Sequence, residues 1–480
     1  MAKNHFIVLN TPEYRVSSKR KVLPTLQKRN FKLDTKHLMI GNGLTYYVKT
    51  YGCQSNIKDS ENISGILNKL GFKEQKDILK ADLIILNTCA IRENAEKKVF
   101  GEIGFLSKLK KTNPKFVFGI CGCMSQEEHV IQKIMKSNNN IDFVFGVHNI
   151  HELPSIIYDV IKNKKRIINV LSNPKSMYES IPSSIGSKVK AFVNIMQGCD
   201  NFCTYCIVPY VRGQMHSRSK QDILNEIKKL IKEGYKEVTL LGQNVNSYGI
   251  DFKGKSYKFW NLLEDVAKTK IPRVRFVTSN PWNFDLKIVD VMKKYPNIMP
   301  YIHLPVQSGD EEILKRMNRK VLVRDYLKKI QYIRKNIKDS AISTDLIVGF
   351  PNESEKAFNN TLKLYKQVKF DNAYTFIYSR REGTPAAKMQ DKISLETKQK
   401  RLQKLNELVK KYSKENNEKY VGKILEVLVE GKSKTNVNTF TGYSPNWKVV
   451  NFTGKCKIGD IVKVKISSAS RFSLNGLLVI

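Results

Sequence analysis

The spacing of apolar residues in the first part of the chain predicts strands that alternate with helices. Short apolar runs predict strands over residues 45–50, 82–87, 115–120 and 143–146. The segments between them, such as residues 59–70, carry apolar side chains at the helical period. Strands separated by helices of about three turns are typical of parallel sheets. We therefore expect an open parallel α/β domain here.

A second α/β series follows, and it has six strands where a closed (β/α)8 barrel has eight. The helical segments between the strands have one apolar stripe, as in residues 221–234. Six units predict an open partial barrel, which leaves one side available to another domain or to a large substrate. The strands are expected over residues 191–196, 237–242, 273–279, 301–306, 341–349 and 373–379.

The pattern changes again after a long amphipathic helix, expected over residues 395–420. The last stretch, about 60 residues, has short strands and turns without a helical period. This predicts a small antiparallel barrel, an architecture often used to bind nucleic acid. The expected division is a basic N-terminal extension (1–43), an α/β domain (44–165), a linker rich in Ser, Pro and Gly (166–188), the partial barrel (189–418) and the small barrel (419–480).

Composition narrows the class of protein. The chain is 41% hydrophobic and 26% charged, and no apolar run is long enough to cross a bilayer. Its first residues lack the apolar segment of a secretory signal, so we expect a cytoplasmic protein without a membrane partner. The eight cysteines then favour metal binding or catalysis over disulfides. The net charge of +39 fits a nucleic-acid partner, but equally a bias toward lysine-rich coding.

Three cysteines lie close together in QGCDNFCTYC, directly after the first strand of the partial barrel. They are Cys199, Cys203 and Cys206. Loops at the carboxyl ends of barrel strands form active sites. Three thiolates suit either a catalytic zinc ion or an iron-sulfur cluster with one iron left open. Asp200 is the one carboxylate in the loop, so a general base for zinc chemistry is not evident nearby.

The first α/β domain has dispersed cysteines that share one position rule. Cys53, Cys89 and Cys123 each follow a predicted strand. The carboxyl ends of parallel strands line one edge of a sheet, so we expect these residues to meet there. Cys123 precedes a helix start and is favoured over Cys121 as a ligand. Cys456, in the small barrel, is interpreted as incidental.

Several longer motifs together resemble the radical S-adenosylmethionine methylthiotransferase family, from about Tyr46 to the end of the chain. In the first domain they are YGCQSN, NTCAIRENAE and GCMSQEE. In the barrel they are QGCDNFCTYCIVPYVRG, LLGQNVNSYG, HLPVQSGDEEILKRMNR, DLIVGFPNES and YSRREGTPAA. The C-terminal barrel is similar to the RNA-binding TRAM module. The partial barrel expected above is also the fold of the radical superfamily.

The resemblance implies two [4Fe-4S] clusters and two molecules of S-adenosylmethionine in each turnover. The cluster on Cys199, Cys203 and Cys206 would generate a radical, and the cluster on Cys53, Cys89 and Cys123 would supply sulfur. The substrate implied by YGCQSN and GQNVNSYG is tRNA with isopentenyladenosine at position 37, next to the anticodon. Flavodoxin or ferredoxin is the expected reductant, and the protein is expected to be a monomer. Two alternatives are a methylthiotransferase acting on threonylcarbamoyladenosine or a ribosomal protein, and a non-catalytic iron-sulfur RNA-binding protein.

Residues that directly follow the barrel strands lie at the mouth of the barrel, and we assign them to cofactor binding. For Gly242 and Gly349 the alternative is a purely structural role in tight turns. We interpret His303 as a satisfied core group, and we expect Tyr378 and Arg380 to approach the substrate. Three residues depart from the family pattern and receive no role: Gln214, Met215 and Asn280. The predicted cofactor contacts are Tyr205, Gly242, Gln243, Asn244, Ser279, Gln307 and Gly349.

Overall fold

The computed structural model describes residues 6–12, 26–90, 93–137, 140–172, 174, 176–254, 256–433 and 436–479. The chain forms two compact units, which we describe separately. The first comprises residues 1–186, 197–202 and 206–218, and the second comprises residues 187–196, 203–205 and 219–480. Among the described residues, no helix is both long and apolar enough to span a membrane.

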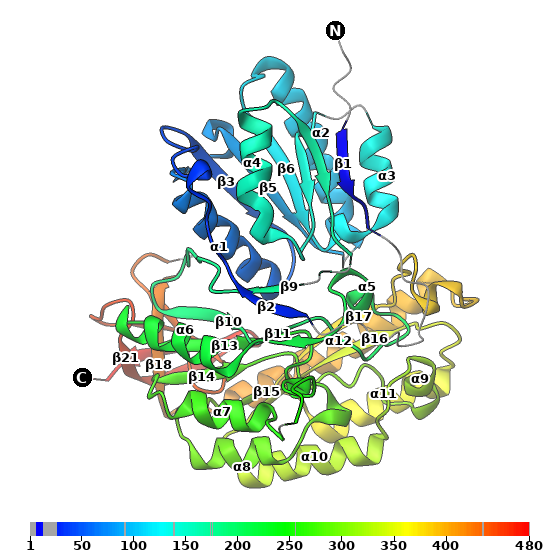
Figure 1. Ribbon diagram of the computed structural model, residues 1–480. Helices are drawn as coiled ribbons and strands as arrows, with labels where there is room; N and C mark the ends of the chain where they lie inside the picture. The colour runs from blue at the N-terminus through cyan, green and yellow to red at the C-terminus, as the bar shows by residue number, and fades with distance from the viewer. Residues whose placement is uncertain are drawn as a thin grey trace. The chain divides into compact units, whose positions relative to one another are not determined.

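The first unit is built on a parallel sheet with the strand order β1-β8-β7-β6-β5-β3-β4 (Figure 1). Its strands are β1 (Phe6–Asn10), β3 (Thr45–Thr50), β4 (Lys73–Glu74), β5 (Leu83–Thr88), β6 (Val117–Gly122), β7 (Phe143–Phe145) and β8 (Arg166–Asn169). Its helices are α1 (Gln54–Lys69), α2 (Glu93–Thr112), α3 (Glu128–Lys136) and α4 (Leu153–Ile161).

Both faces of this sheet are covered. Leu83 and Ile85 pack in a core with residues of α1 and α4, whereas Ile84 and Leu86 pack in a second core with residues of α2 and α3. Successive side chains of a strand point to opposite faces, so a strand buried on both sides is apolar throughout. This explains why the LIIL run of β5 lacks the alternation of a half-exposed strand.

The N-terminal extension and the predicted linker differ from the expectation. β1 joins the sheet beside β8, and β2 (Gln27–Asn30) pairs with β9 (Ser176–Glu179). The predicted extension therefore contains β1 and β2, and the predicted linker contains both β8 and β9. The strands of each pair lie more than a hundred residues apart and are short, so no local pattern indicates them. Residues 1–5 and 13–25 of the extension lie outside the described residues.

The second unit contains the six barrel strands in two parallel sheets of three. The first sheet is β10 (Lys190–Asn194), β13 (Glu237–Leu241) and β14 (Arg273–Phe276); the second is β15 (Tyr301–His303), β16 (Ala341–Val348) and β17 (Asn372–Ile377). Three short elements flank the cysteine loop: β11 (Met196–Gln197) precedes it, and α5 (Val208–Val211) and β12 (His216–Ser217), which belong to the first unit, follow it. The helices are α6 (Lys220–Lys232), α7 (Phe259–Ala267), α8 (Lys287–Lys294), α9 (Glu311–Arg316), α10 (Val323–Asn336), α11 (Glu355–Val368) and α12 (Leu395–Glu418).

The C-terminal strands close into a barrel with the order β18-β19-β20-β22-β21. Four of its five pairings are antiparallel, and β20 pairs with β22 in parallel. The predicted small barrel is confirmed, and its one parallel pair arises because a closed ring with an odd number of strands cannot alternate direction throughout. The strands are β18 (Ile424–Lys432), β19 (Phe440–Tyr443), β20 (Val449–Thr453), β21 (Ile461–Ala469) and β22 (Ser473–Leu478).

Two buried arginines of β14 attach this small barrel to the partial barrel. Arg273 donates to the Tyr443 carbonyl at 2.7 Å and pairs with Glu426 at 2.8 Å. Arg275 donates to the carbonyls of Ser444 and Pro445 at 2.9 and 2.7 Å. Hydrogen bonds from charged donors are stronger than neutral ones, so the contact is well defined.

Candidate functional site

The structure brings the three cysteines Cys53, Cys89 and Cys123 to the carboxyl ends of adjacent strands in the first unit. Cys53 is the N-cap of α1, Cys89 follows β5, and Cys123 follows β6 and caps a 3-10 turn. Gly52 has φ +123, and a Cβ on it would lie 2.7 Å from the Cys89 Cβ. The chain before Cys53 can therefore pass close to Cys89 only because residue 52 is glycine.

Cys121 and Cys123 face different surroundings although they are two residues apart. Cys121 packs in the core under α1 and α4, whereas Cys123 packs with Ala90 and with residues of the segment that follows the radical motif. Burial raises the pKa of Cys121 well above its usual value. Burial also raises the pKa of Cys123 to about 12, and the nearby Cys89 and Cys53 add to the rise. The preference for Cys123 over Cys121 as a ligand fits this placement.

A buried arginine contacts the Cys123 sulfur. Arg212 Nε lies 3.1 Å from Cys123 Sγ, and Arg212 Nη2 lies 2.6 Å from Asp59 Oδ2. Burial lowers the pKa of Arg212, but the negative charges of Asp59, Cys123 and Cys53 outweigh this effect and raise it well above the usual value. A cationic donor beside a thiolate stabilises the charged sulfur that a metal needs. Neither Arg212 nor Asp59 was predicted as a site residue from the sequence.

The radical motif is divided between the two units. In the first unit the Cys199 amide donates to the Gly213 carbonyl at 3.2 Å. Gly198 before it has φ +73, and a Cβ there would lie 2.1 Å from the Gln214 carbonyl oxygen. Asp200 accepts a hydrogen bond from the Met215 amide at 3.2 Å, so its carboxylate holds the loop.

In the second unit, Cys203 and Tyr205 lie beside another buried arginine. Arg319 Nη1 is 3.3 Å from the Tyr205 hydroxyl and 3.9 Å from Cys203 Sγ. Burial lowers the pKa of Arg319, but Tyr205 and Cys203 reverse this and raise it. Thr204, between them, is anchored by backbone bonds with Met317 and Ala386 at 3.0 and 2.9 Å. These two backbone hydrogen bonds and Arg319 fix this half of the loop in place.

The mouth of the partial barrel holds side-chain oxygens that lack partners. Asn244, Ser279 and Gln307 follow β13, β14 and β15, and each is less than a tenth exposed. Asn244 Oδ1, Ser279 Oγ and Gln307 Oε1 have no hydrogen-bond partner among the described residues. A buried unpaired polar atom costs about 1–3 kcal/mol. Three such atoms at the active end of a barrel fit a polar ligand such as S-adenosylmethionine.

The two predicted glycines and Gln243 have less distinctive surroundings. Gly349 has φ +68, and its amide donates to Glu353 Oε2 at 2.8 Å. A Cβ on Gly242 would lie 2.5 Å from Met196 Cγ, and Gln243 lies in the same loop. The local backbone geometry or packing therefore accounts for glycine at both positions, in agreement with the purely structural role given above as the alternative to cofactor binding.

Family models match three stretches of the chain. The Uncharacterized protein family UPF0004 matches residues 45–146, the Radical SAM superfamily matches residues 193–365 and the TRAM domain matches residues 418–479. A tRNA-2-methylthio-N(6)-dimethylallyladenosine synthase of Malacoplasma penetrans is 56% identical over 98% of this chain and 96% of its own length. The chain belongs to this synthase family.

Other relatives carry the same name, and one solved structure shares the fold. Synthases with the same name from Staphylococcus epidermidis and Bacillus mycoides are 50% and 49% identical over 98% of this chain and 92% and 93% of their own lengths. The radical S-adenosylmethionine methyltransferase TsrM from Kitasatospora setae, with cobalamin and a [4Fe-4S] cluster bound, superposes with a TM-score of 0.51 at 11% identity. The match covers 72% of this chain and 74% of TsrM, and it shows a shared fold.

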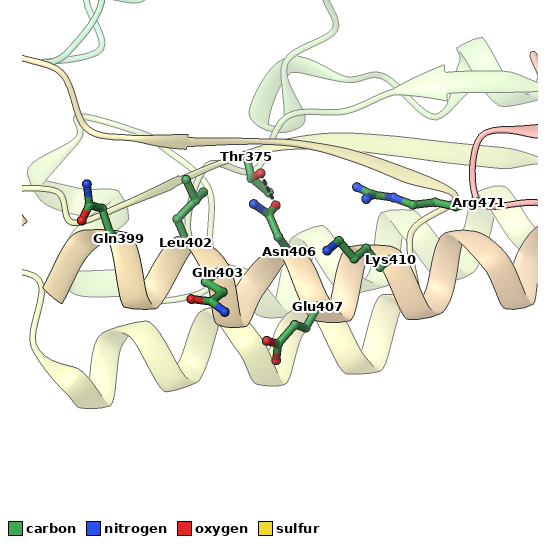
Figure 2. A pocket seen from close by; sticks show the side chains of 8 residues that line it. All are labelled: Thr375, Gln399, Leu402, Gln403, Asn406, Glu407, Lys410 and Arg471. Carbon is green, nitrogen blue, oxygen red and sulfur yellow. Dashed lines mark hydrogen bonds between the residues drawn. The ribbon is translucent and has the colours of Figure 1, made fainter. Parts of the chain in front are cut away.

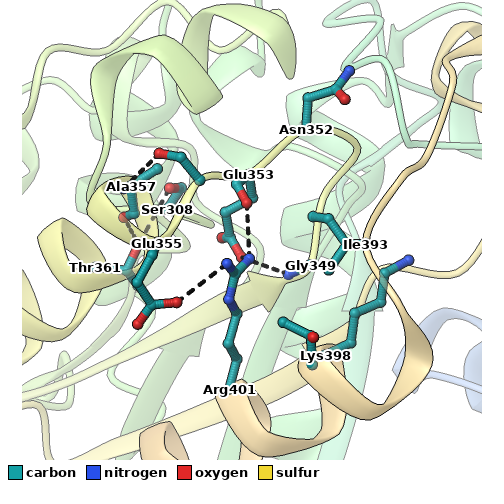
Figure 3. Close-up of polar contacts among 12 residues, drawn as sticks. Ser308, Gly349, Asn352, Glu353, Glu355, Ala357, Thr361, Ile393, Lys398 and Arg401 are labelled. Atoms are coloured by element: carbon teal, nitrogen blue, oxygen red, sulfur yellow. Dashed lines mark hydrogen bonds and ion pairs between the residues drawn. The ribbon is translucent and has the colours of Figure 1, made fainter.

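Within the synthase family's radical barrel, sequence analysis missed the pair formed by Glu353 and Arg401 (Figure 3). Arg401 of α12 lies 2.8 Å from Glu353 Oε2 and donates to the Glu353 carbonyl at 2.9 Å. Burial raises the pKa of Glu353, although Gly349 and Arg401 act against the rise. The pair fastens the loop after β16 to α12. In the sequence, the only indication of the pair is the acidic residue Glu353 in the motif GFPNES.

The remaining predicted residues have the following places. His303 Nδ1 is 2.8 Å from Ser343 Oγ and Nε2 is 3.5 Å from Asp345, as expected for a satisfied group. Asn280 caps the turn at Pro281–Asn283. Tyr378 is buried against Phe350, and Arg380 is exposed. Cys456 packs at the edge of the small barrel's core. Among the described side chains, no group of three or more His, Cys, Asp or Glu is placed to hold a single metal ion.

Proposed function

We propose that this chain is a radical S-adenosylmethionine tRNA methylthiotransferase. It converts N6-isopentenyladenosine at position 37 of tRNA into 2-methylthio-N6-isopentenyladenosine. The observation that carries this proposal is the whole-length match to synthases named for that product, in a chain that retains both cysteine triads. Carbon 2 of adenine bears a hydrogen too inert for acid-base catalysis, so a radical route suits the reaction.

Iron-sulfur and S-adenosylmethionine chemistry is expected for a member of this family. We assign one [4Fe-4S] cluster to Cys199, Cys203 and Cys206, and a second to Cys53, Cys89 and Cys123. When bound, these groups would supply the radical, the methyl group and the sulfur, with two S-adenosylmethionine molecules per turnover. Three thiolates per cluster leave one iron open in each.

The protein's own residues hold and orient these groups. Arg212 donates to the Cys123 sulfur and offsets thiolate charge in a buried site. Asn244, Ser279 and Gln307 offer buried hydrogen-bonding atoms to the cofactor at the barrel mouth. Arg319 holds Tyr205 in place within the radical loop. Gly242, Gln243 and Gly349 complete the proposed cofactor contacts.

The partners follow from the same assignment. The substrate is tRNA, and the closed C-terminal barrel is the expected RNA-binding module. A flavodoxin or ferredoxin supplies electrons. We propose a cytoplasmic monomer.

Nucleoside analysis of tRNA tests the reaction and the substrate together. A strain that lacks this gene should accumulate isopentenyladenosine and lose its 2-methylthio derivative, and the intact gene should restore it. A gene in which Cys123 is replaced by alanine should not restore it. Unchanged methylthiolation of isopentenyladenosine, with loss of methylthiolated threonylcarbamoyladenosine, would overturn this substrate assignment in favour of the related one.

A further inference from the structure

The last strand of the partial barrel carries two exposed aromatic side chains. β17 is the end strand of its sheet, and among the described strands it pairs only with β16. Tyr374 is 48% exposed and Phe376 is 38% exposed. They lie two residues apart, so they share one face and are spaced by roughly 7 Å along the strand. We call them the aromatic pair.

The face that carries the aromatic pair is the one turned away from α12. Thr375, between the two aromatics, donates to Asn406 Oδ1 of α12 at 2.6 Å, so its side of the strand faces the helix. The Tyr374 ring meets the His303 ring of β15 edge to face at 5.9 Å. The aromatic pair therefore lies on the face shared by β15, β16 and β17 opposite α12.

Hydrogen-bonding groups lie beside the aromatic pair. Asp345 is the register partner of Tyr374 on β16, and its carboxylate is 3.5 Å from His303 Nε2. Both side chains keep some exposure, at 26% and 15%. A flat apolar surface with polar groups at its margin can take up an aromatic ring that has polar edges.

The other side of the same strand borders a groove of about 530 Å³ (Figure 2). Figure 2 shows the cationic ends of Lys410 and Arg471 directed into the same space as Asn406. No carboxylate among the described residues lies within ion-pair distance of either cation. The groove is lined by Thr375, Gln399, Leu402, Gln403, Asn406, Glu407, Lys410 and Arg471.

We propose that β17 is an RNA-contact strand, in which the aromatic pair stacks an unpaired nucleobase of the tRNA anticodon loop and Lys410 and Arg471 bind neighbouring phosphates. This inference rests on the proposed tRNA substrate. A nucleotide that crosses the free edge of β17 presents its base to one face and its phosphate to the other. Stacking on aromatics combined with cationic contacts to the backbone is the usual way of holding single-stranded RNA.

Base stacking on the aromatic pair and phosphate contacts of Lys410 and Arg471 respond differently to salt. Stacking of one base on an aromatic side chain is worth about 1–3 kcal/mol, which corresponds to roughly 5- to 150-fold in affinity. It releases no counterions, so its loss leaves the salt dependence unchanged. Each phosphate contact contributes about one unit to the slope of log K against log salt.

The experiment uses the full chain and an anticodon stem-loop RNA with 2-aminopurine in place of the adenosine that follows the anticodon. We expect the wild-type protein to bind this RNA and to quench the 2-aminopurine fluorescence by stacking. Tyr374→Ala and Phe376→Leu should each weaken binding about tenfold and reduce the quenching, with an unchanged salt slope. Tyr374→Phe retains the ring and should behave as wild type. Phe376→Leu keeps apolar bulk, so folding is preserved when the aromatic face is lost.

Lys410→Gln and Arg471→Gln test the groove. Each should weaken binding and lower the salt slope by about one. Lys404→Gln is the matched control, because Lys404 is an exposed lysine of the same helix that does not line the groove.

Wild-type affinity and quenching in both aromatic variants would overturn the proposal and assign the pair to another ligand or to packing. A wild-type protein that does not bind the stem-loop would instead overturn the proposed tRNA substrate.

Discussion

Replacing Arg212 by methionine should destabilise the first unit strongly. The side chains of Arg212 and Asp59 are each 7% exposed and form a 2.6 Å ion pair. Methionine preserves much of the apolar volume but leaves Asp59 buried without its cation. Removing one partner of a buried pair costs about 3–5 kcal/mol, because the remaining charge has neither water nor a counterion. We therefore expect the free energy of unfolding of the first unit to fall by about 3–5 kcal/mol.

The assay must report on the first unit alone, since one unfolding free energy does not describe a chain of two units. Amide hydrogen exchange in peptides from α1 and β6 does so for the cluster-free protein. A loss of 3–5 kcal/mol should reduce protection there by roughly two to four powers of ten. All three tryptophans, Trp260, Trp282 and Trp447, lie in the second unit, so their fluorescence transition in urea should be unchanged.

A second substitution separates the charge effect from lost packing. Asp59→Asn in the Arg212→Met background replaces the buried carboxylate by a neutral amide. The double variant should then regain most of the lost amide-exchange protection in α1 and β6, and should be more stable than Arg212→Met alone. Wild-type protection in Arg212→Met, or no recovery in the double variant, would refute the reasoning.

Three further outcomes are expected. Protein reconstituted without oxygen should hold about eight irons per chain. A variant in which Cys199, Cys203 and Cys206 are all replaced by alanine should retain about half of them, whereas loss of all iron would contradict two independent sites. Cys123→Ser should lose the iron of the first unit while Cys121→Ser retains it, as measured by iron content and absorbance, because Cys123 lies beside Cys53 and Cys89, the other two proposed ligands, whereas Cys121 packs in the core. Gly349→Ala should lower stability by about 1–2 kcal/mol, since its φ is +68 and the new Cβ meets the Lys398 side chain, and a urea midpoint for the second unit equal to wild type would contradict this.

The positions of the cysteines in the candidate site were predictable because their signals are local. Each cysteine of the dispersed triad follows a buried strand, and the carboxyl ends of parallel strands meet at one edge. The groups that surround the cysteines were not predictable in this way. Arg212 and Asp59 are separated by 153 residues, and Arg319 and Cys203 by 116. The residues next to Arg212 and Arg319 in the sequence give no sign that these side chains are buried.

The sequence by itself determined the alternation of strands and helices, the six-strand count of the partial barrel, the two cysteine triads and the family. These features depend on the periodicity of apolar residues and on short motifs, which are present in the sequence whatever its tertiary structure. Only the tertiary structure decided that β1 extends the first sheet, that one pair of the small barrel is parallel, and that Cys123 contacts a buried cation. These depend on which distant segments pack together, because a buried charge or an edge strand is stable only with the partner that packing supplies.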